Sequence, residues 1–123
     1  TPLQPMDFKK QKPIYLQIAD QLCERMLQGE WQEGGRMASV RDVATDLGVN
    51  PNTVQRSFAW LEEHDIIASR RGIGYFLTDH AKRRIIRMQR DQFIHREWPD
   101  VLHRMEVLGL TLKDNQLAEK EAE

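Results

Sequence analysis

Residues 39–61, SVRDVATDLGVNPNTVQRSFAWL, decide the fold of this chain of 123 residues. Ser39 is followed three residues later by Asp42, a pattern close to a capping box, which predicts the start of a helix. That helix is expected to end at Gly48, because glycine adopts the left-handed conformation that closes a helix without steric cost. Asn50-Pro51 predicts a second start, since Asn is a preferred N-cap and Pro is tolerated at the next position.

Two short helices joined by a turn of about three residues that contains glycine form a helix-turn-helix. Val54, Phe58 and Leu61 are expected to face the core. The residues expected on or near the outer face are then Asn52, Thr53, Gln55, Arg56 and Ala59. Amide and guanidinium side chains make bidentate contacts with base edges in the major groove of DNA. The free backbone N–H groups at the start of the second helix are also expected to bind phosphate. A helical hairpin with a merely polar surface is the alternative for this segment alone.

The flanking sequence predicts the rest of a winged helix. A first helix is expected from Pro13 to Gly29, with apolar residues recurring every fourth position, and residues 34–36 are expected to form a loop. Two short β-prone runs, 66–69 and 75–77, are joined by Arg70-Arg71-Gly72-Ile73-Gly74, which predicts a hairpin. Its tip would place arginine beside the minor groove or a phosphate, although a basic hairpin tip is often simply solvated.

The remaining residues are expected to be helical. One helix is predicted over about 78–98 and is ended by Pro99, and a second over about 99–108 is closed by Gly109. Residues 111–114 look like the cap of a last short helix. Apolar stripes on an isolated pair of helices must be buried, and a second copy of the chain is the simplest partner. The predicted dimerisation residues are Ile85, Phe93, Trp98, Leu102 and Met105.

Composition narrows the function. The net charge is −1, yet residues 36–90 hold ten basic and six acidic residues, whereas residues 91–123 hold four and eight. This asymmetry suggests that the middle of the chain meets phosphate. No apolar run approaches the roughly 20 residues that span a bilayer, and Cys23 is the single cysteine. We therefore expect a cytoplasmic protein that is no enzyme, contacts no membrane, and has no metal site and no cofactor.

The chain resembles the GntR family of bacterial regulators from Pro13 to Leu77. The stretches PIYLQIADQL, SVRDVATDLGVNPNTVQRSFAWLE and IIASRRGIGYFL carry this resemblance. It implies an N-terminal winged helix-turn-helix that binds operator DNA and a C-terminal domain for dimerisation and, usually, effector sensing. The residues that it implies for DNA contact are Arg41 at the start of the second helix, Asn50, Asn52, Thr53 and Gln55 in the recognition helix, and Arg71 and Gly72 at the wing tip.

The sequence departs from the family pattern at two places. Met37-Ala38-Ser39 stands where the family usually has Leu-Pro-Ser, and Pro51 and Gln55 stand where many members carry Arg. The base readout of those members is therefore not transferred. Ser39 and Arg56 complete the predicted DNA-binding set.

The short tail is similar to that of the YtrA-like subfamily, where it mainly pairs subunits. Forty-five residues cannot enclose a ligand pocket of roughly 300–1,000 Å³, so an effector, if there is one, would bind between tail helices of the dimer. The expected fold is mainly α with a small β-hairpin: a winged helix-turn-helix domain over 1–78, opened by an arm over 1–12, and a helical dimerisation tail over 79–123. The expected function is a homodimeric repressor that reads a palindromic operator. The alternative is a winged-helix adaptor that binds protein and not DNA.

Overall fold

A computed structural model of the chain describes residues 12–121. The predicted mainly α fold with a small β-hairpin is confirmed, and a second hairpin is added at the end. The predicted arm falls almost wholly on residues 1–11, outside the described residues. In chain order the elements are α1 Ile14–Leu27, α2 Val40–Leu47, α3 Pro51–Glu63, β1 Ile67–Arg70, β2 Gly74–Leu77, α4 Ala81–Gln92, the π-helical turn η2 Phe93–Glu97, α5 Trp98–Val107, β3 Leu110–Lys113 and β4 Gln116–Glu119.

The chain divides into two compact units within α4, the first ending at Ile85 and the second beginning at Ile86. The predicted boundary lay earlier, between residues 78 and 79. Asp79 and His80 form a turn before α4. The first turn of that helix belongs to the first unit, and its residues Ala81 and Ile85 are fully buried. No helix within residues 12–121 is long and apolar enough to cross a membrane.

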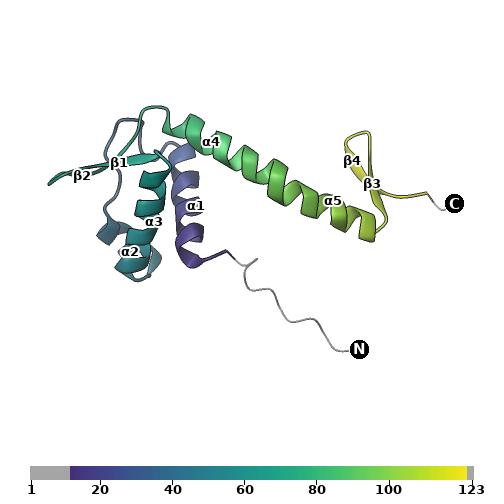
Figure 1. The fold of residues 1–123 in the computed structure, drawn as a ribbon, viewed down its shortest axis with the longest axis horizontal. Coiled ribbons are helices and arrows are strands. Elements are labelled where there is room, and N and C mark those ends of the chain that lie inside the picture. Colours follow the sequence, from purple (N-terminus) through teal and green to yellow (C-terminus); the bar gives the residue numbers. More distant parts are fainter. Residues whose placement is uncertain (1–11, 122–123) are drawn as a thin grey trace. The chain divides into compact units, whose positions relative to one another are not determined.

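The core of the first unit lies between α1 and α3, which pack side by side (Figure 1). The stripe predicted on the first helix is buried from Ile18 to Met26, whereas Ile14 at its start is 62% exposed. The three residues predicted to anchor α3 have no exposed surface. Burying such side chains contributes about 1.5–3 kcal/mol each. The principal buried residues of these two helices are Ile18, Leu22, Cys23, Met26, Val54, Phe58 and Leu61.

The predicted helix caps are confirmed. The Ser39 hydroxyl accepts from the Asp42 N–H at 3.1 Å, and the Asp42 carboxylate accepts from the Ser39 N–H at 3.4 Å. Gly48 closes α2 with φ +65°, and the Asn50 side chain accepts from the Asn52 N–H at 2.8 Å. Pro13 stands one position before the helix, as N-cap, and not at its first residue.

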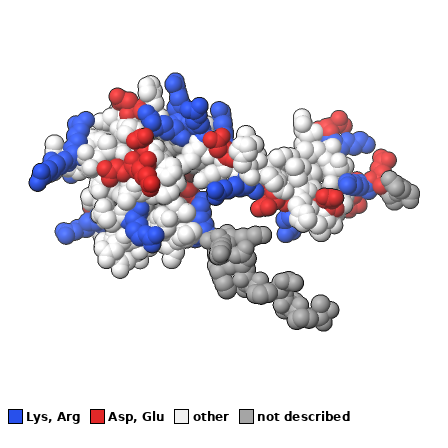
Figure 2. Space-filling view, viewed as in Figure 1, with Lys and Arg blue, Asp and Glu red and all other residues white. Residues whose placement is uncertain are grey.

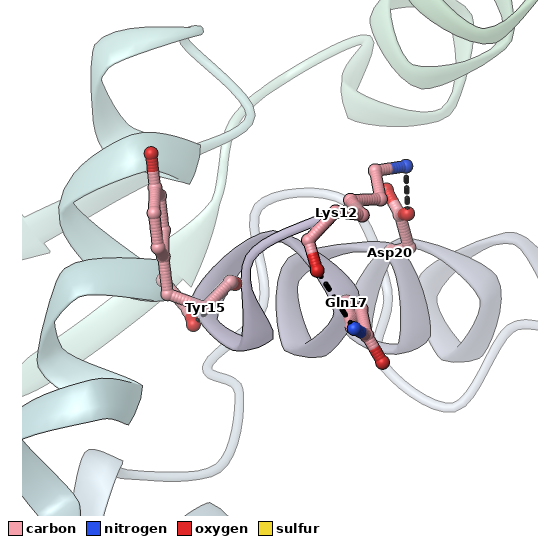
Figure 3. A network of polar contacts seen from close by, with 5 residues as sticks. Lys12, Tyr15, Gln17 and Asp20 are labelled. Atoms are coloured by element: carbon pink, nitrogen blue, oxygen red, sulfur yellow. Dashed lines mark hydrogen bonds and ion pairs between the residues drawn. The ribbon is translucent and has the colours of Figure 1, made fainter. Parts of the chain in front are cut away.

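Pro13 provides no side-chain cap for α1. Two other side-chain contacts stabilise the start of this helix. The Gln17 amide donates to the Lys12 carbonyl oxygen at 2.8 Å, and the Lys12 ammonium pairs with Asp20 (Figure 3). These contacts hold Lys12, two residues before the helix, against the first two turns of α1.

The wing is larger than predicted. β1 and β2 pair antiparallel from Ile67↔Leu77 to Arg70↔Gly74. The segment expected to be a loop over 34–36 belongs to no strand, but Arg36 forms an isolated bridge with Phe76 that the prediction did not include. That segment lies along the other edge of β2: the Met37 N–H donates to the Tyr75 carbonyl at 3.0 Å, and the Leu77 N–H donates to the Gly35 carbonyl at 3.0 Å. The two glycines gave no local strand signal, because their pairing depends on β2, about forty residues later in the chain.

Pro99 does not end the fourth helix as predicted. The backbone stays helical through Pro99, and the turn over 93–97 changes to π form, with the Trp98 N–H bonded to the Phe93 carbonyl. Proline lacks the N–H that an α-helix needs at that position. A π-turn next to it adapts the hydrogen-bond ladder locally, as such single-turn π segments do inside α-helices.

The predicted last helix is also wrong. Residues 110–119 form a second hairpin, in which β3 and β4 pair antiparallel from Leu110↔Glu119 to Lys113↔Gln116. Asp114 and Asn115 take positive φ of 53° and 63°. Two consecutive left-handed residues make the tight turn that joins two strands, and Asp and Asn are the non-glycine residues that tolerate it.

Candidate nucleic-acid interface

The α3 helix presents a polar face to solvent. Asn52, Gln55 and Arg56 are exposed, whereas Val54, Phe58 and Leu61 are fully buried on the opposite side. This alternation follows from about 3.6 residues per helical turn. The outward orientation predicted for these polar side chains is therefore confirmed. Thr53 is half-buried at the margin of the same face.

The backbone at the start of α3 differs from the prediction. Pro51 has no N–H, and the Asn52 N–H donates to the Asn50 side chain. The N–H groups of Thr53 and Val54 donate to the Asn50 carbonyl at 3.0 and 3.3 Å. The predicted free N–H groups for phosphate are thus already occupied. A strong cap stabilises the helix start at the expense of its capacity to bind an anion, so side chains must provide the contacts here.

A hydrogen bond joins α3 to the wing. The Gln55 side-chain amide donates to the Tyr75 hydroxyl at 3.2 Å. The Tyr75 ring meets the Phe58 ring edge-on, with centroids 4.8 Å apart. A second hydrogen bond, from the Ser69 hydroxyl on β1 to the Glu62 carboxylate on α3 at 3.0 Å, also attaches the wing to the recognition helix.

The other side of α3 is held by α1. The Arg56 guanidinium lies over the Tyr15 ring, 4.2 Å from its centroid, and the buried Ser57 hydroxyl donates to the Tyr15 carbonyl at 2.7 Å. Stacking on an aromatic ring restricts the arginine while leaving its charge exposed. Arg56 thus lies at the border of the polar face nearest to α1.

The residues predicted around the recognition helix take different roles. Arg41 is exposed near the start of α2. The Ser39 hydroxyl and the Asn50 side-chain oxygen are engaged in helix caps, so these two residues shape the surface through the helices that they begin. Arg71 and Gly72 are exposed at the wing tip, where Gly72 takes φ +78°.

Sequence reasoning missed Arg36. It forms a β-bridge opposite Phe76 on β2, and its side chain extends over Gly74. A Cβ built at Gly74 would stand 3.2 Å from Arg36 Nε, closer than an ordinary van der Waals contact. The local sequence places this arginine in a loop, and only knowledge of the strand pairing could have placed it on the wing.

The first unit exposes basic side chains at several places, alongside acidic ones (Figure 2). Figure 2 shows basic groups at the end of the wing and at several points around the helices. Among residues 12–121, no carboxylate oxygen pairs within 4.0 Å with Arg36, Arg41, Arg56, Arg70 or Arg71. The same described range brings together no group of three His, Cys, Asp or Glu side chains suited to a metal ion.

An exposed polar recognition helix, flanked by a basic wing and preceded by a short capped helix, is the arrangement of a DNA-reading winged helix. The family model for bacterial regulatory proteins of the gntR family matches residues 14–77. The chain belongs to the GntR family. Its members are transcriptional regulators that bind DNA through this domain, and they are not enzymes.

Two curated Bacillus subtilis proteins support a YtrA-like placement within the GntR family. The "Uncharacterized HTH-type transcriptional regulator YhcF" is 37% identical over 107 residues, which cover 87% of each chain. The "HTH-type transcriptional repressor YtrA" is 37% identical over 81 residues, 66% of this chain and 62% of that protein. A solved GntR-family transcriptional regulator from Listeria monocytogenes has a TM-score of 0.68 at 38% identity, covering 86% of this chain and 90% of its own.

Proposed function

We propose that this GntR-family chain is a repressor that binds a palindromic operator as a homodimer. The observation that carries the proposal is the exposed face of α3, where two amide side chains, Asn52 and Gln55, point away from a fully packed core. These side chains suit base edges in the major groove. The name of the B. subtilis relative YtrA, a repressor, supports the sign of regulation.

Phosphate contacts would position the domain. Arg41 near the start of α2 and Arg71 at the wing tip are both exposed. Arg56 is held at the α1 border by Tyr15. Contacts to phosphate fix orientation and add affinity for any sequence, whereas base contacts give specificity. We assign Arg41 and Arg71 to the first role, and Asn52, Gln55 and Arg56 to the second.

The second unit supports dimer formation. Phe93 is 49% exposed and Leu102 is 46% exposed, and Trp98 stacks on Phe93 with ring centroids 6.2 Å apart. Such apolar exposure on a small unit marks an interaction surface. Ile85 and Met105, also predicted for the interface, are buried within the chain itself, Ile85 in the first unit and Met105 in the second, so we leave them out of the proposed surface. Further exposed apolar residues of this unit are Ile86, Ile94, Val101, Val107, Leu108, Leu112 and Leu117.

An open hollow of about 440 Å³ lies along the same helical stretch, lined by Ile86, Gln89, Arg90, Phe93 and Ile94. A small-molecule effector needs an enclosed pocket that buries most of its surface. We therefore propose the hollow as part of the dimer surface, and an effector site would form only between two copies. The expected place of action is the cytoplasm, where the operator lies.

Binding to DNA is tested by fluorescence anisotropy with fragments of the promoter of the chain's own gene. Loss of one base-reading side chain costs about 1–3 kcal/mol, so Gln55→Ala is expected to weaken operator binding while unrelated DNA is bound as before. Arg41→Ala is expected to weaken both and to lower the salt dependence. Arg104→Ala, on the exposed surface of α5, is the matched control. Unchanged operator affinity in both Gln55→Ala and Arg41→Ala would overturn the proposed site.

The dimer is tested by sedimentation equilibrium. Leu102→Glu places a charge on the exposed apolar surface and is expected to shift the chain toward monomer, whereas His103→Glu, at an exposed polar neighbour, leaves the mass unchanged. A monomeric wild-type chain at micromolar concentration would contradict the homodimer. Failure to retain any promoter DNA would favour the alternative, a protein-binding adaptor.

A further inference from the structure

The outer face of the wing carries two arginines on either side of an aromatic ring. Residues paired across antiparallel strands point to the same side of the sheet, and so do residues two apart along a strand. Phe76 pairs with Ala68 on β1 and forms the bridge with Arg36 on its other edge. Arg70, two residues after Ala68, therefore shares the side of Arg36 and Phe76.

The side chains agree with this register. The Arg70 guanidinium lies over the Phe76 ring, 4.2 Å from its centroid, and the Arg36 guanidinium extends over Gly74. Both arginines are exposed, and Phe76 is half-buried. Tyr75 and Leu77, on the opposite side of the sheet, face the core of the first unit: the Tyr75 ring meets the Phe58 ring, and Leu77 is buried.

The two guanidinium groups lack an acidic partner among the described residues. None of the ion pairs within residues 12–121 involves Arg36 or Arg70. The acidic residue that meets β1, Glu62, accepts from Ser69, whose side chain alternates to the other side of the strand. Two unneutralised, pre-ordered guanidinium groups form a surface suited to phosphate oxygens, which arginine binds with paired donors.

This surface is continuous with the wing tip, because Arg70 directly precedes Arg71. We propose that Arg36 and Arg70 form a second phosphate-binding surface, which holds the DNA backbone flanking each half-site. It reads no bases and extends the contacted length of duplex beyond the segment that α3 and the wing tip reach. The proposal rests on the proposed DNA-binding function and adds a role for the wing face that points away from α3.

Glycine at position 74 is part of this surface. Its φ is +138°, in a region that L-residues rarely adopt, and its missing Cβ leaves the Arg36 side chain room to cross the strand. A Cβ here would stand 3.2 Å from Arg36 Nε, so the guanidinium would have to shift to make room. The geometry thus keeps Arg36 in contact with the wing, although Arg36 comes from a segment far away in the sequence.

The test uses the full chain, hydroxyl-radical footprinting and anisotropy titrations in increasing salt. Wild-type protein is expected to protect backbone positions outside each half-site. Arg36→Ala combined with Arg70→Ala is expected to lose only those outer positions and to keep the protection within the half-sites. Removal of each phosphate-binding side chain should lower the slope of log affinity against log salt by about 0.9.

Duplex length gives a second readout. On a duplex extended by about one helical turn (roughly 10 bp) at each side, the double variant is expected to bind about fivefold to tenfold more weakly than wild type. On the unextended operator the two proteins should bind alike. Arg36→Lys with Arg70→Lys keeps the charges and should restore most of the affinity, and an unchanged thermal unfolding curve shows that the fold is intact.

Equal weakening on both duplexes, or protection at the outer positions by the double variant, would overturn the second surface while leaving the operator-binding proposal in place. If wild-type protein retains no operator DNA at all, the proposed function itself is wrong. The two failures are therefore distinguishable.

Discussion

The side-chain amide of Gln55 on α3 donates a hydrogen bond to the hydroxyl of Tyr75 on β2, with 3.2 Å between Nε2 and Oη. The recognition helix and the wing thus share a polar contact at the surface proposed to meet DNA. A glutamine tethered in this way has fewer orientations available, which lowers the entropy lost when its amide pairs with a base.

Tyr75→Phe removes the acceptor and keeps the ring against Phe58. Because both groups of the deleted bond are near solvent, we expect the free energy of unfolding to fall by no more than about 1 kcal/mol. Discrimination at the base pair read by Gln55 should weaken within the range of about 1–3 kcal/mol set by one bidentate contact. Anisotropy titrations against operators changed at single positions check this. Full discrimination in Tyr75→Phe would mean that the tether does not orient Gln55.

The Ser57 hydroxyl is a buried polar group in the α1–α3 core, and it donates to the Tyr15 carbonyl at 2.7 Å. Ser57→Ala deletes this bond in a site that water does not reach, so we expect a loss of about 0.5–1.5 kcal/mol in the free energy of unfolding. Urea unfolding measures it. Ser69→Ala is the control, because the exposed Ser69 hydroxyl donates to Glu62 where water can replace it. Equal losses in the two variants would argue against the buried bond.

Gly48 separates the two helices of the helix-turn-helix, and its φ of +65° is strained for most residues. A Cβ at this position would meet no atom within 4 Å, so the cost of a substitution comes from the backbone alone. Gly48→Ala is expected to lower the free energy of unfolding by about 1–2 kcal/mol. Gly48→Asn should cost less, since Asn tolerates the left-handed region. Thermal unfolding of both variants checks the order, and an Asn variant less stable than the Ala variant would contradict it.

Burial raises the pKa of the Cys23 thiol to about 12, with smaller contributions from the nearby Asp20 and Glu24 carboxylates. Below pH 9 the thiol is protonated in both the folded and the unfolded chain. Above pH 9 the unfolded chain releases the proton and the folded chain retains it, so stability falls as pH rises toward about 12. Cys23→Ala should lose stability at neutral pH, because of the cavity, and should show a shallower decline between about pH 9 and pH 11 than wild type.

Thiol reactivity gives an independent check on Cys23. A disulfide reagent at about pH 8 should label the native chain very slowly, since the reaction needs the thiolate, and should label it rapidly in denaturant. Fast labelling of the native protein, with the pH profile of an ordinary exposed thiol, would contradict the raised pKa.

The parts predicted well from the sequence were those decided by neighbouring residues. The capping box at Ser39, the left-handed Gly48 and the Asn50 cap depend on residues within three or four positions, and each formed as expected. The outward direction of Asn52 and Gln55 followed from the helical spacing of the apolar residues of α3, which begin at Val54. Short-range chemistry and helical periodicity were sufficient here.

The errors came from partners that are distant along the chain or from backbone adjustments with weak signals. The strand-like pairing of residues 34–37 depends on β2, and so does the role of Arg36. The turn at Asp114-Asn115 carries a hairpin signal that competes with the helix-cap pattern just before it. The occupied N–H groups at the start of α3 follow from the strength of the Asn50 cap, so the residue that predicts the helix start also removes its backbone from phosphate.

The π-turn over residues 93–97 fits more chain into one turn than an α-helix does. Each residue of an α-helix advances the side-chain direction by about 100°, but the wider π-turn takes up one extra residue without passing this rotation on to α5. Deleting one residue from the turn is therefore expected to close it into α form and to leave the direction of the α5 side chains unchanged. The same deletion within α5 would rotate every later residue of that helix, so this turn is the place where the tail tolerates a change of length.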